Sequence, residues 1–265
     1  MMLDVNHVYK TFHPGTINER RALAGVDLHL EEGDFVTVIG GNGAGKSTLL
    51  NAVAGVWPVD GGSIVIDGND ITGLPDYKRA PFIGRVFQDP MMGTAPDMQL
   101  EENLALAYRR GKKLGLRWHI NREERDMYRE RLRELNLGLE DRLTTKVGLL
   151  SGGQRQAVTL LMASLQKPRL LLLDEHTAAL DPATAAKVLE LSDRIVQENG
   201  LTTMMITHNM KDAIRHGNRL IMMNKGEIIF DCCGEEKAKL TVEDLLEKFA
   251  QISGSTLDND RALLG

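Results

Sequence analysis

A glycine-rich run that ends in lysine and serine, residues 40–47, has the clearest chemical meaning in the sequence. It reads Gly40-Gly41-Asn42-Gly43-Ala44-Gly45-Lys46-Ser47, and it follows a β-branched segment and precedes a helical pattern. Glycines let the backbone curl until several N–H groups face one anion, and the helix start adds its positive end. Lys46 can supply a cation to the β- and γ-phosphates of a nucleotide, and Ser47 a hydroxyl to Mg²⁺. The spacing therefore predicts a phosphate-binding loop between a strand and a helix.

Two adjacent acids follow a run of leucines in the second half of the chain. Leu170 to Leu173 lead directly into Asp174 and Glu175. The leucines suit a central strand that is buried on both faces, and ligands of open α/β sheets bind at the carboxyl ends of such strands. We assign Asp174 to Mg²⁺, through water, and Glu175 as the general base that orients an attacking water.

A second anion site is predicted where a serine and two glycines open a helix. Leu150-Ser151-Gly152-Gly153-Gln154 precedes a helical pattern that runs to about Gln166, before Pro168. Since one loop already cradles one phosphate chain, this second helix start suggests contact with a nucleotide held by a different subunit. The five residues match the LSGGQ signature, and the chain here resembles the ABC ATPase family. The resemblance implies that residues 150–154 close over the γ-phosphate bound by a partner copy.

The resemblance extends over nearly the whole chain and assigns further roles. It implies that Phe12 stacks on adenine, with Tyr9 as the rival, and that Gln88 senses Mg²⁺ and the attacking water. It also implies that Asp181 belongs to a loop crossing a dimer interface, where it is also an N-cap before Pro182, and that His208 contacts the γ-phosphate. The residues expected to bind the nucleotide are then Phe12, Gly40, Gly41, Asn42, Gly43, Ala44, Gly45, Lys46, Ser47 and Thr48. The residues expected to hold Mg²⁺ are Ser47, Gln88 and Asp174. The residues expected to act in catalysis are Glu175, His208 and Gln88.

One position departs from the family pattern. The residue after the catalytic glutamate is usually proline in the family, and here it is His176. The segment DEHTAALD, which starts at Asp174, is similar to ATPases of a bacterial uptake group tied to aromatic amino-acid import. The exchange leaves both acids in place, so the resemblance still implies hydrolysis.

Composition limits the other classes of function. A net charge of -5 and a pI near 5.8 argue against a protein that mainly holds nucleic acid. No apolar run approaches the roughly 20 residues that span a bilayer, and the start of the chain has no signal-peptide pattern.

The adjacent Cys232 and Cys233 are poorly placed to form a disulfide with each other, so we expect the protein to lie in the cell interior. The basic stretch from Arg109 to Arg117 is interpreted as a solvated helix end or as a surface near anionic lipid.

The pattern of apolar residues predicts an α/β fold. Helices are expected at 49–56, 122–135, 183–199 and from Val242 after a Thr241 cap, and strands at 3–9, 26–30, 35–39, 63–66, 170–173, 203–207, 220–224 and 228–230. With the resemblance, this indicates a P-loop NTPase (RecA-like) core with a mainly parallel sheet, an N-terminal antiparallel β subdomain and an inserted α-helical subdomain. We place the ATP-binding core at 1–93 and 152–240, the helical subdomain at 94–151, and a C-terminal helix and tail at 241–265.

The expected function is that of the ATP-hydrolysing motor subunit of a membrane ABC transporter. The resemblance implies a homodimer with transmembrane permease subunits, an extracytoplasmic substrate-binding protein, ATP and Mg²⁺, no nucleic acid, and a place on the cytoplasmic face of a bacterial membrane. Import of small solutes such as amino acids is the expected direction. Three alternatives remain: a soluble ABC ATPase acting on nucleic acid or ribosomes, a P-loop kinase of small molecules, and a regulatory binder without hydrolysis.

Overall fold

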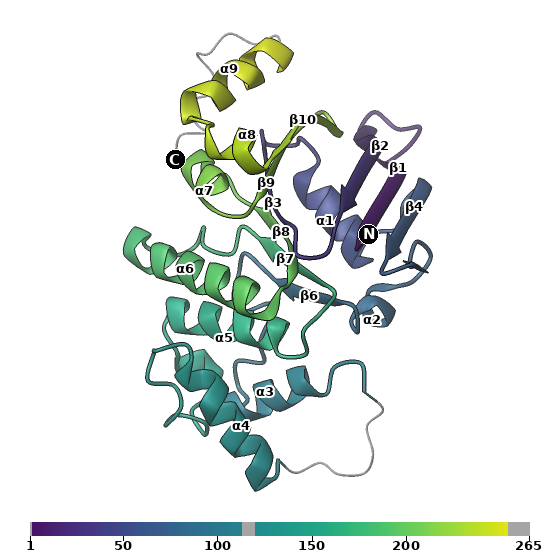
Figure 1. Cartoon of the computed structure of the whole chain (residues 1–265). Helices are drawn as coiled ribbons and strands as arrows, with labels where there is room; N and C mark the ends of the chain where they lie inside the picture. The colour runs from purple at the N-terminus through teal and green to yellow at the C-terminus, as the bar shows by residue number, and fades with distance from the viewer. Residues whose placement is uncertain (1, 113–119, 254–265) are drawn as a thin grey trace. The chain divides into compact units, whose positions relative to one another are not determined.

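The computed structural model describes residues 2–112 and 120–253 of the 265-residue chain. The described residues form two compact units, one from residues up to Arg79 and from Gly200 onward, and one from Ala80 to Asn199 (Figure 1). These contact boundaries differ from the predicted subdomain boundaries, which lie after residues 93 and 151. The predictions for residues 113–117 and for the tail after Ser253 lie outside the described residues.

The first unit begins with an antiparallel sheet in the order β2-β1-β4-β5. Its strands are β1 (Leu3–Phe12), β2 (Arg20–Leu30), β4 (Gly61–Ile66) and β5 (Asn69–Asp70). Leu3 pairs with Leu30 on one side and with Ile66 on the other, and all three side chains are buried. The β1–β2 hairpin extends further than predicted, to the pair Phe12–Arg20. Register shifts within β1 interrupt the alternation that a sequence reading depends on.

The same unit holds four strands in the order β10-β9-β3-β8. β3 (Phe35–Gly40) runs parallel to β8 (Thr202–Ile206) and β9 (Arg219–Asn224), and β10 (Glu227–Cys233) closes an antiparallel hairpin with β9. Thr203, Met204 and Ile206 are buried, as parallel strands covered on both faces require. The parallel pairing brings the ends of β3 and β8 to one edge.

In the described part of this unit the helices are α1 (Lys46–Ala54), α2 (Asp76–Arg79), α7 (Met210–Arg215), α8 (Gly234–Ala238) and α9 (Val242–Ser253). α1 contacts β2 and β3, and α9 contacts α7 (Figure 1). The predicted cap of α9 is confirmed, because the Asp244 amide donates to Thr241 Oγ1 at 3.2 Å and the Thr241 amide donates to Asp244 Oδ2 at 2.8 Å. Leu245 and Phe249 of α9 are buried in a cluster with Ile39 and Met210.

The second unit pairs β6 (Ile83–Val86) with β7 (Leu170–Asp174) in parallel. Its helices are α3 (Leu100–Tyr108), α4 (Arg122–Arg133), α5 (Gly152–Ser164) and α6 (Pro182–Asn199), with a 3₁₀ turn at Val147–Leu149. The predicted stripe of Tyr128, Leu132 and Leu135 is confirmed as buried. α5 contacts α6, α3 and β6, so it occupies the middle of this unit (Figure 1).

The start of the basic stretch is not a solvated helix end. Arg109 Nη2 bonds Glu124 Oε1 at 3.1 Å, and Arg110 Nη2 donates to the Ala163 carbonyl at 3.1 Å. Both arginines are only partly exposed and hold α3 against neighbouring elements of the second unit. The charge pattern alone predicted solvation, because it does not reveal the carbonyl and carboxylate partners that tertiary packing supplies.

Candidate nucleotide site

The glycine-rich loop of the first unit is shaped by contacts that exclude side chains. Gly40, Gly43 and Gly45 have φ values of 147°, 80° and 109°. A Cβ atom on Gly40 would lie 2.2 Å from the Met223 carbonyl oxygen, and one on Gly45 would lie 2.6 Å from the Ala22 carbonyl oxygen. Since backbone cannot move aside as a side chain can, only glycine fits at both positions. Asn42, Gly43 and Ser47 remain exposed at the surface of the loop.

Lys46 is the first residue of α1 and is buried. Its Nζ donates to the carbonyl oxygens of Gly40 at 2.7 Å and Gly41 at 3.1 Å. The ammonium group therefore lies along the inner curve of the loop. A cation in this place, at the start of a helix, favours an anion in the loop through both its own charge and the helix dipole.

A second cation, Arg20, also contacts the loop. Arg20 Nη2 donates to the Gly43 carbonyl at 3.0 Å, from the first residue of β2. The sequence analysis did not select this arginine. Only the β1–β2 pairing brings it to the loop, and no local pattern marks that approach.

His208 lies at the same edge as the loop. It follows β8, is exposed, and shares a small cavity with Ile39, Gly40, Met210 and Phe249. Asn209 fixes the next helix, because its Oδ1 accepts from the amides of Lys211 at 2.9 Å and Asp212 at 3.3 Å. The structure thus brings together the predicted loop and the predicted histidine within the first unit.

Phe249 of α9 completes this part of the site and was missed by sequence reasoning. Its Cζ lies 3.6 Å from the position a Cβ of Gly41 would take. The amphipathic pattern predicted the helix but not the loop that its apolar face covers. The aromatic ring therefore lies beside the start of the loop, on the side of α9.

The aromatic residues of β1 differ in how they are engaged. Tyr9 lies against Gly25, where a Cβ would be 2.8 Å from the Tyr9 hydroxyl, so it is part of the sheet packing. Phe12 meets the edge of Trp57 with ring centroids 4.9 Å apart, and Lys10 Nζ lies 5.7 Å from the Phe12 centroid. Both rings are partly exposed, so Phe12 as the adenine-stacking residue, with Tyr9 as its rival, stays a prediction. Trp57 is a further aromatic that the sequence analysis did not select.

In the second unit, Asp174 ends β7 and is paired with an arginine. Arg85 Nη2 bonds Asp174 Oδ2 at 3.1 Å, and the guanidinium carbon lies 4.5 Å from the Phe87 ring centroid. Burial lowers the pKa of Arg85, and the Asp174 charge opposes that shift. The pairing of β6 with β7 places this cation, which the sequence did not point to, beside the predicted Mg²⁺ carboxylate.

Gln88 and Glu175 occupy the turns that follow these two strands. Gln88 is exposed, and the carbonyl of the preceding Phe87 accepts from Gln156 Nε2 at 3.2 Å. Glu175 has a φ of 46°, a left-handed conformation that few non-glycine residues adopt. Its carbonyl accepts from the Ala178 amide at 2.9 Å and closes the turn that leads to Asp181.

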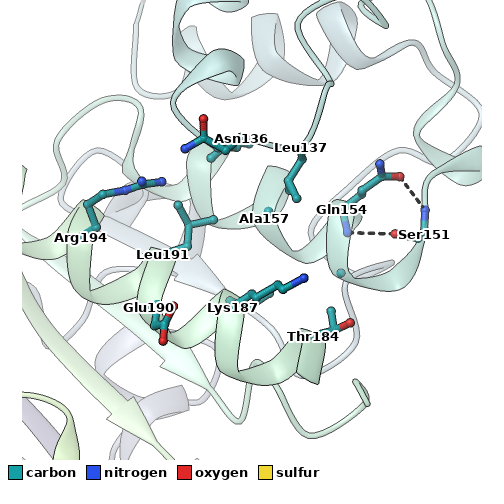
Figure 2. Close-up of a pocket in the computed structure, with 13 residues that line it drawn as sticks. Asn136, Leu137, Ser151, Gln154, Ala157, Thr184, Lys187, Glu190, Leu191 and Arg194 are labelled. Carbon is teal, nitrogen blue, oxygen red and sulfur yellow. Dashed lines mark hydrogen bonds between the residues drawn. The ribbon is translucent and has the colours of Figure 1, made fainter. Parts of the chain in front are cut away.

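The predicted second anion site is an exposed helix start. Ser151 caps α5 through a reciprocal pair: the Gln154 amide donates to Ser151 Oγ at 3.3 Å, and the Ser151 amide donates to Gln154 Oε1 at 3.2 Å (Figure 2). Ser151 and Gly152 are exposed, whereas Leu150 is buried. The start of α5 thus faces outward from the second unit.

Gly153 has a packing role as well. A Cβ there would lie 2.3 Å from Thr184 Cγ2, and one on Gly152 would lie 3.4 Å from Leu180 Cδ2. Asp181 Oδ1 accepts from the Thr184 amide at 3.1 Å, which confirms the predicted N-cap, and the hydroxyl and amide of Thr184 hold the Asp181 pKa below its usual value. The structure therefore brings residues 150–154 and the loop of Asp181 together.

Beside Ser151 the surface opens into a cavity of about 690 Å³ between α5, α6 and the loop after α4 (Figure 2).

Among the described residues, no group of three or more His, Cys, Asp and Glu side chains could hold a metal ion. None of the described helices combines the length and the apolar character needed to cross a bilayer.

Residues 23–178 match the sequence family described as ABC transporter. The chain belongs to this family. Among its relatives is a tyrosine transport ATP-binding protein of Clostridioides difficile strain R20291, 47% identical over 94% of this chain and 98% of the relative. A xylose/arabinose import ATP-binding protein of Sulfolobus acidocaldarius is 34% identical over 93% of this chain and 92% of the relative.

Solved structures of ABC cassettes support the same assignment. The ADP conformation of one transporter cassette aligns with a TM-score of 0.76 at 27% identity, over 96% of this chain and 99% of that chain. A dimeric cassette in a post-hydrolysis state with ADP and Pi aligns with a TM-score of 0.74 at 31% identity, over 88% of this chain and 98% of that chain. The predicted family and P-loop NTPase fold class are confirmed. This ABC protein is an ATP-binding subunit of a transporter, and it is an ATPase.

Proposed function

We propose that this ABC ATPase powers the import of a small amino-acid-type solute, working as a pair of copies with transmembrane permease subunits. The exposed, capped start of α5 carries the proposal. An open helix start binds anions, and the glycine loop of the first unit already provides a cradle for one phosphate chain. The second anion site then serves the ATP of the other copy. An extracytoplasmic binding protein would deliver the solute, and the ATPase would act at the cytoplasmic face of a bacterial membrane.

We assign the nucleotide to the loop of residues 40–48, with Phe12 against the base. Lys46 would exchange its two carbonyl partners for phosphate oxygens, and the loop amides would take the remaining charge. Stacking on an aromatic ring is worth about 1–3 kcal/mol per base. His208, which shares the cavity of Gly40, would contact the γ-phosphate from the neighbouring strand end.

The donors assigned to Mg²⁺ suit a hard cation. Ser47 offers a hydroxyl, Gln88 an amide oxygen and Asp174 a carboxylate, and Mg²⁺ prefers oxygen ligands while keeping several waters. When bound, Mg²⁺ would supply charge neutralisation to the β- and γ-phosphates.

We assign Glu175 as the general base. Its carboxylate would orient a water in line with the γ-phosphorus and accept a proton as the water oxygen bonds to phosphorus. The bond from the γ-phosphorus to the bridging oxygen breaks, and ADP and phosphate are formed. Loss of the γ-phosphate removes the anion that holds Ser151 of the other copy, so the pair opens.

The contact with the permease is proposed at exposed apolar side chains that include Met92, which follows Gln88 by four residues in the sequence. Met92 and Leu149 are 69% and 73% exposed. Arg155 links the two segments, because it donates to Met91 Sδ at 2.8 Å and to the Gly148 carbonyl at 2.9 Å. Flexible methionine side chains suit a surface that must follow a moving partner. This position would transmit a change at Gln88 to the permease.

The test of the motor is Glu175→Gln. We expect this variant to bind ATP, to lose turnover by about 10²–10⁴-fold, and to accumulate closed pairs, because binding persists while the proton acceptor is gone. ATPase assays and sedimentation with ATP measure both effects. Lys46→Ala is the companion, which should lose ATP affinity and therefore form no pairs. Normal turnover in Glu175→Gln would exclude Glu175 as the base.

The cargo proposal rests on the tyrosine transport relative and on the DEHTAALD segment. Cells that lack this subunit should lose uptake of labelled tyrosine and keep uptake of labelled arabinose. Wild-type protein should restore uptake, and Glu175→Gln should not. Loss of arabinose uptake instead of tyrosine uptake, with its restoration by the wild-type protein, would contradict the amino-acid proposal while leaving the ATPase assignment intact.

A further inference from the structure

The turn after β7 carries Glu175 on a strained backbone. Glu175 has a φ of 46°, a conformation that persists only where neighbouring structure enforces it. In the family that this chain resembles, the next residue is usually proline, whose ring fixes its own φ near about −65°. Here the next residue is His176, which leaves that dihedral unrestricted. A contact other than the pyrrolidine ring of proline must therefore hold the backbone of this turn.

His176 is buried, with 2% of its surface exposed, and contacts α6. Its Nε2 lies 2.9 Å from Oγ of Ser192, which is 16 residues further along the chain and also buried. Ser192 Oγ lies 2.8 Å from the Val188 carbonyl oxygen, to which it donates. A hydroxyl has one hydrogen, so a Ser192 that donates to Val188 accepts from His176, and the imidazole tautomer decides which of the two groups donates.

The two hydrogen bonds, one between His176 and Ser192 and one between Ser192 and Val188, end on the backbone of a helix, so the position of the imidazole is held rigidly. The Val188 carbonyl belongs to α6, and Val188 itself is buried. The backbone of residue 176 is thereby tied to α6 from within the core.

We propose that His176 is a positioning residue for hydrolysis: through Ser192 it anchors the turn that aims the Glu175 carboxylate. The inference rests on the proposed role of Glu175 as general base. His176 touches no reacting atom. It replaces the rigidity of a proline ring with a side-chain anchor, and misplacement of a catalytic group by about 1 Å can cost up to about 10²-fold in rate.

The test removes the anchor without emptying the core. His176→Phe keeps an aromatic ring and loses the ring nitrogen that bonds Ser192, and Ser192→Ala loses the hydroxyl. We expect each variant to lower kcat about tenfold, with KM for ATP changed less than about twofold, since the nucleotide loop is untouched. The double variant should fall no further than either single one, because both break the same link. His176→Pro should restore kcat to within about twofold of wild type.

Ser164→Ala is the matched control. Ser164 is a buried serine of α5 whose Oγ donates to the Leu160 carbonyl at 2.9 Å, four residues back, as Ser192 does in α6. It has no histidine partner among the described contacts. We expect Ser164→Ala to keep kcat. Equal losses of kcat in Ser164→Ala and Ser192→Ala would mean that helix packing alone matters, and would overturn the proposal.

Two further outcomes separate the inference from the proposed function. If Glu175→Gln is inactive while His176→Phe and Ser192→Ala hydrolyse ATP normally, the base stands and the anchor is wrong. If Glu175→Gln hydrolyses ATP normally, both fail together.

Discussion

The anion loop of the first unit and the acidic edge of the second unit are built in different ways. The loop is shaped by backbone meeting backbone, as at Gly45 against the Ala22 carbonyl. The acidic edge is shaped by side-chain bonds, such as Arg85 to Asp174 and His176 to Ser192. A backbone contact cannot be adjusted by changing the neighbour, whereas a side-chain contact can. Gly40 and Gly45 should therefore tolerate no substitution, and the acidic edge should tolerate compensated ones.

The largest effect is expected from Gly45→Ala. The new Cβ would meet the Ala22 carbonyl at 2.6 Å in a residue with a φ of 109°, so strain and clash add to about 3 kcal/mol or more. Nucleotide binding should be lost with it. Gly68→Ala is the control, because Gly68 has a φ of 73° and open space around it, and about 1 kcal/mol is expected there. Denaturant unfolding compares the two, and equal losses would remove the distinction drawn for the loop.

An intermediate and repairable effect is expected from Gly153→Ala. Its Cβ would meet Thr184 Cγ2 at 2.3 Å, which overpacks α5 against α6 by about 1–3 kcal/mol. Adding Thr184→Ser removes the clashing methyl group and keeps the hydroxyl, so stability should return. Thermal unfolding of the single and double variants measures this. A double variant no more stable than Gly153→Ala would show that backbone, not the methyl group, limits this contact.

The smallest change in stability is expected from Ser151→Ala. Loss of the cap of α5 should cost about 1 kcal/mol. Asn121→Ala is the matched control, since Asn121 caps α4 through the same reciprocal pair, with the Glu124 amide donating to Asn121 Oδ1 at 2.8 Å. Both variants should lose similar stability, but only Ser151→Ala should weaken ATP-driven pairing in sedimentation. Equal pairing by both would remove Ser151 from the proposed contact with the partner's ATP.

The elements fixed by local pattern were predictable. The loop of residues 40–47, the caps of α5 and α9, and the apolar stripe of α4 all follow from spacing, because each depends on neighbours within a few residues. Residues placed by strand pairing were not predictable. Arg85 meets Asp174 across 89 residues, and Arg20 meets Gly43 across 23. Nothing near Arg85 or Arg20 in the sequence records these partners.

His176 shows a third case. The sequence analysis recognised the departure from proline but had no partner to assign, since Ser192 lies within an unremarkable helical pattern. The anchor depends on the packing of the turn against α6, and only coordinates supply that. The departure from proline at residue 176 is visible in the sequence, whereas its physical reason, the bond to Ser192, is visible only in the fold.

The ring of Phe249 on Gly41 has a consequence for the end of the chain. Linkage is reciprocal: if α9 steadies the start of the phosphate loop, nucleotide in the loop must in turn steady α9. The amides of residues 242–253 should then exchange their hydrogens with deuterated solvent more slowly when ATP is bound. A helix far along the sequence from the glycine run would thereby report on whether the loop is filled.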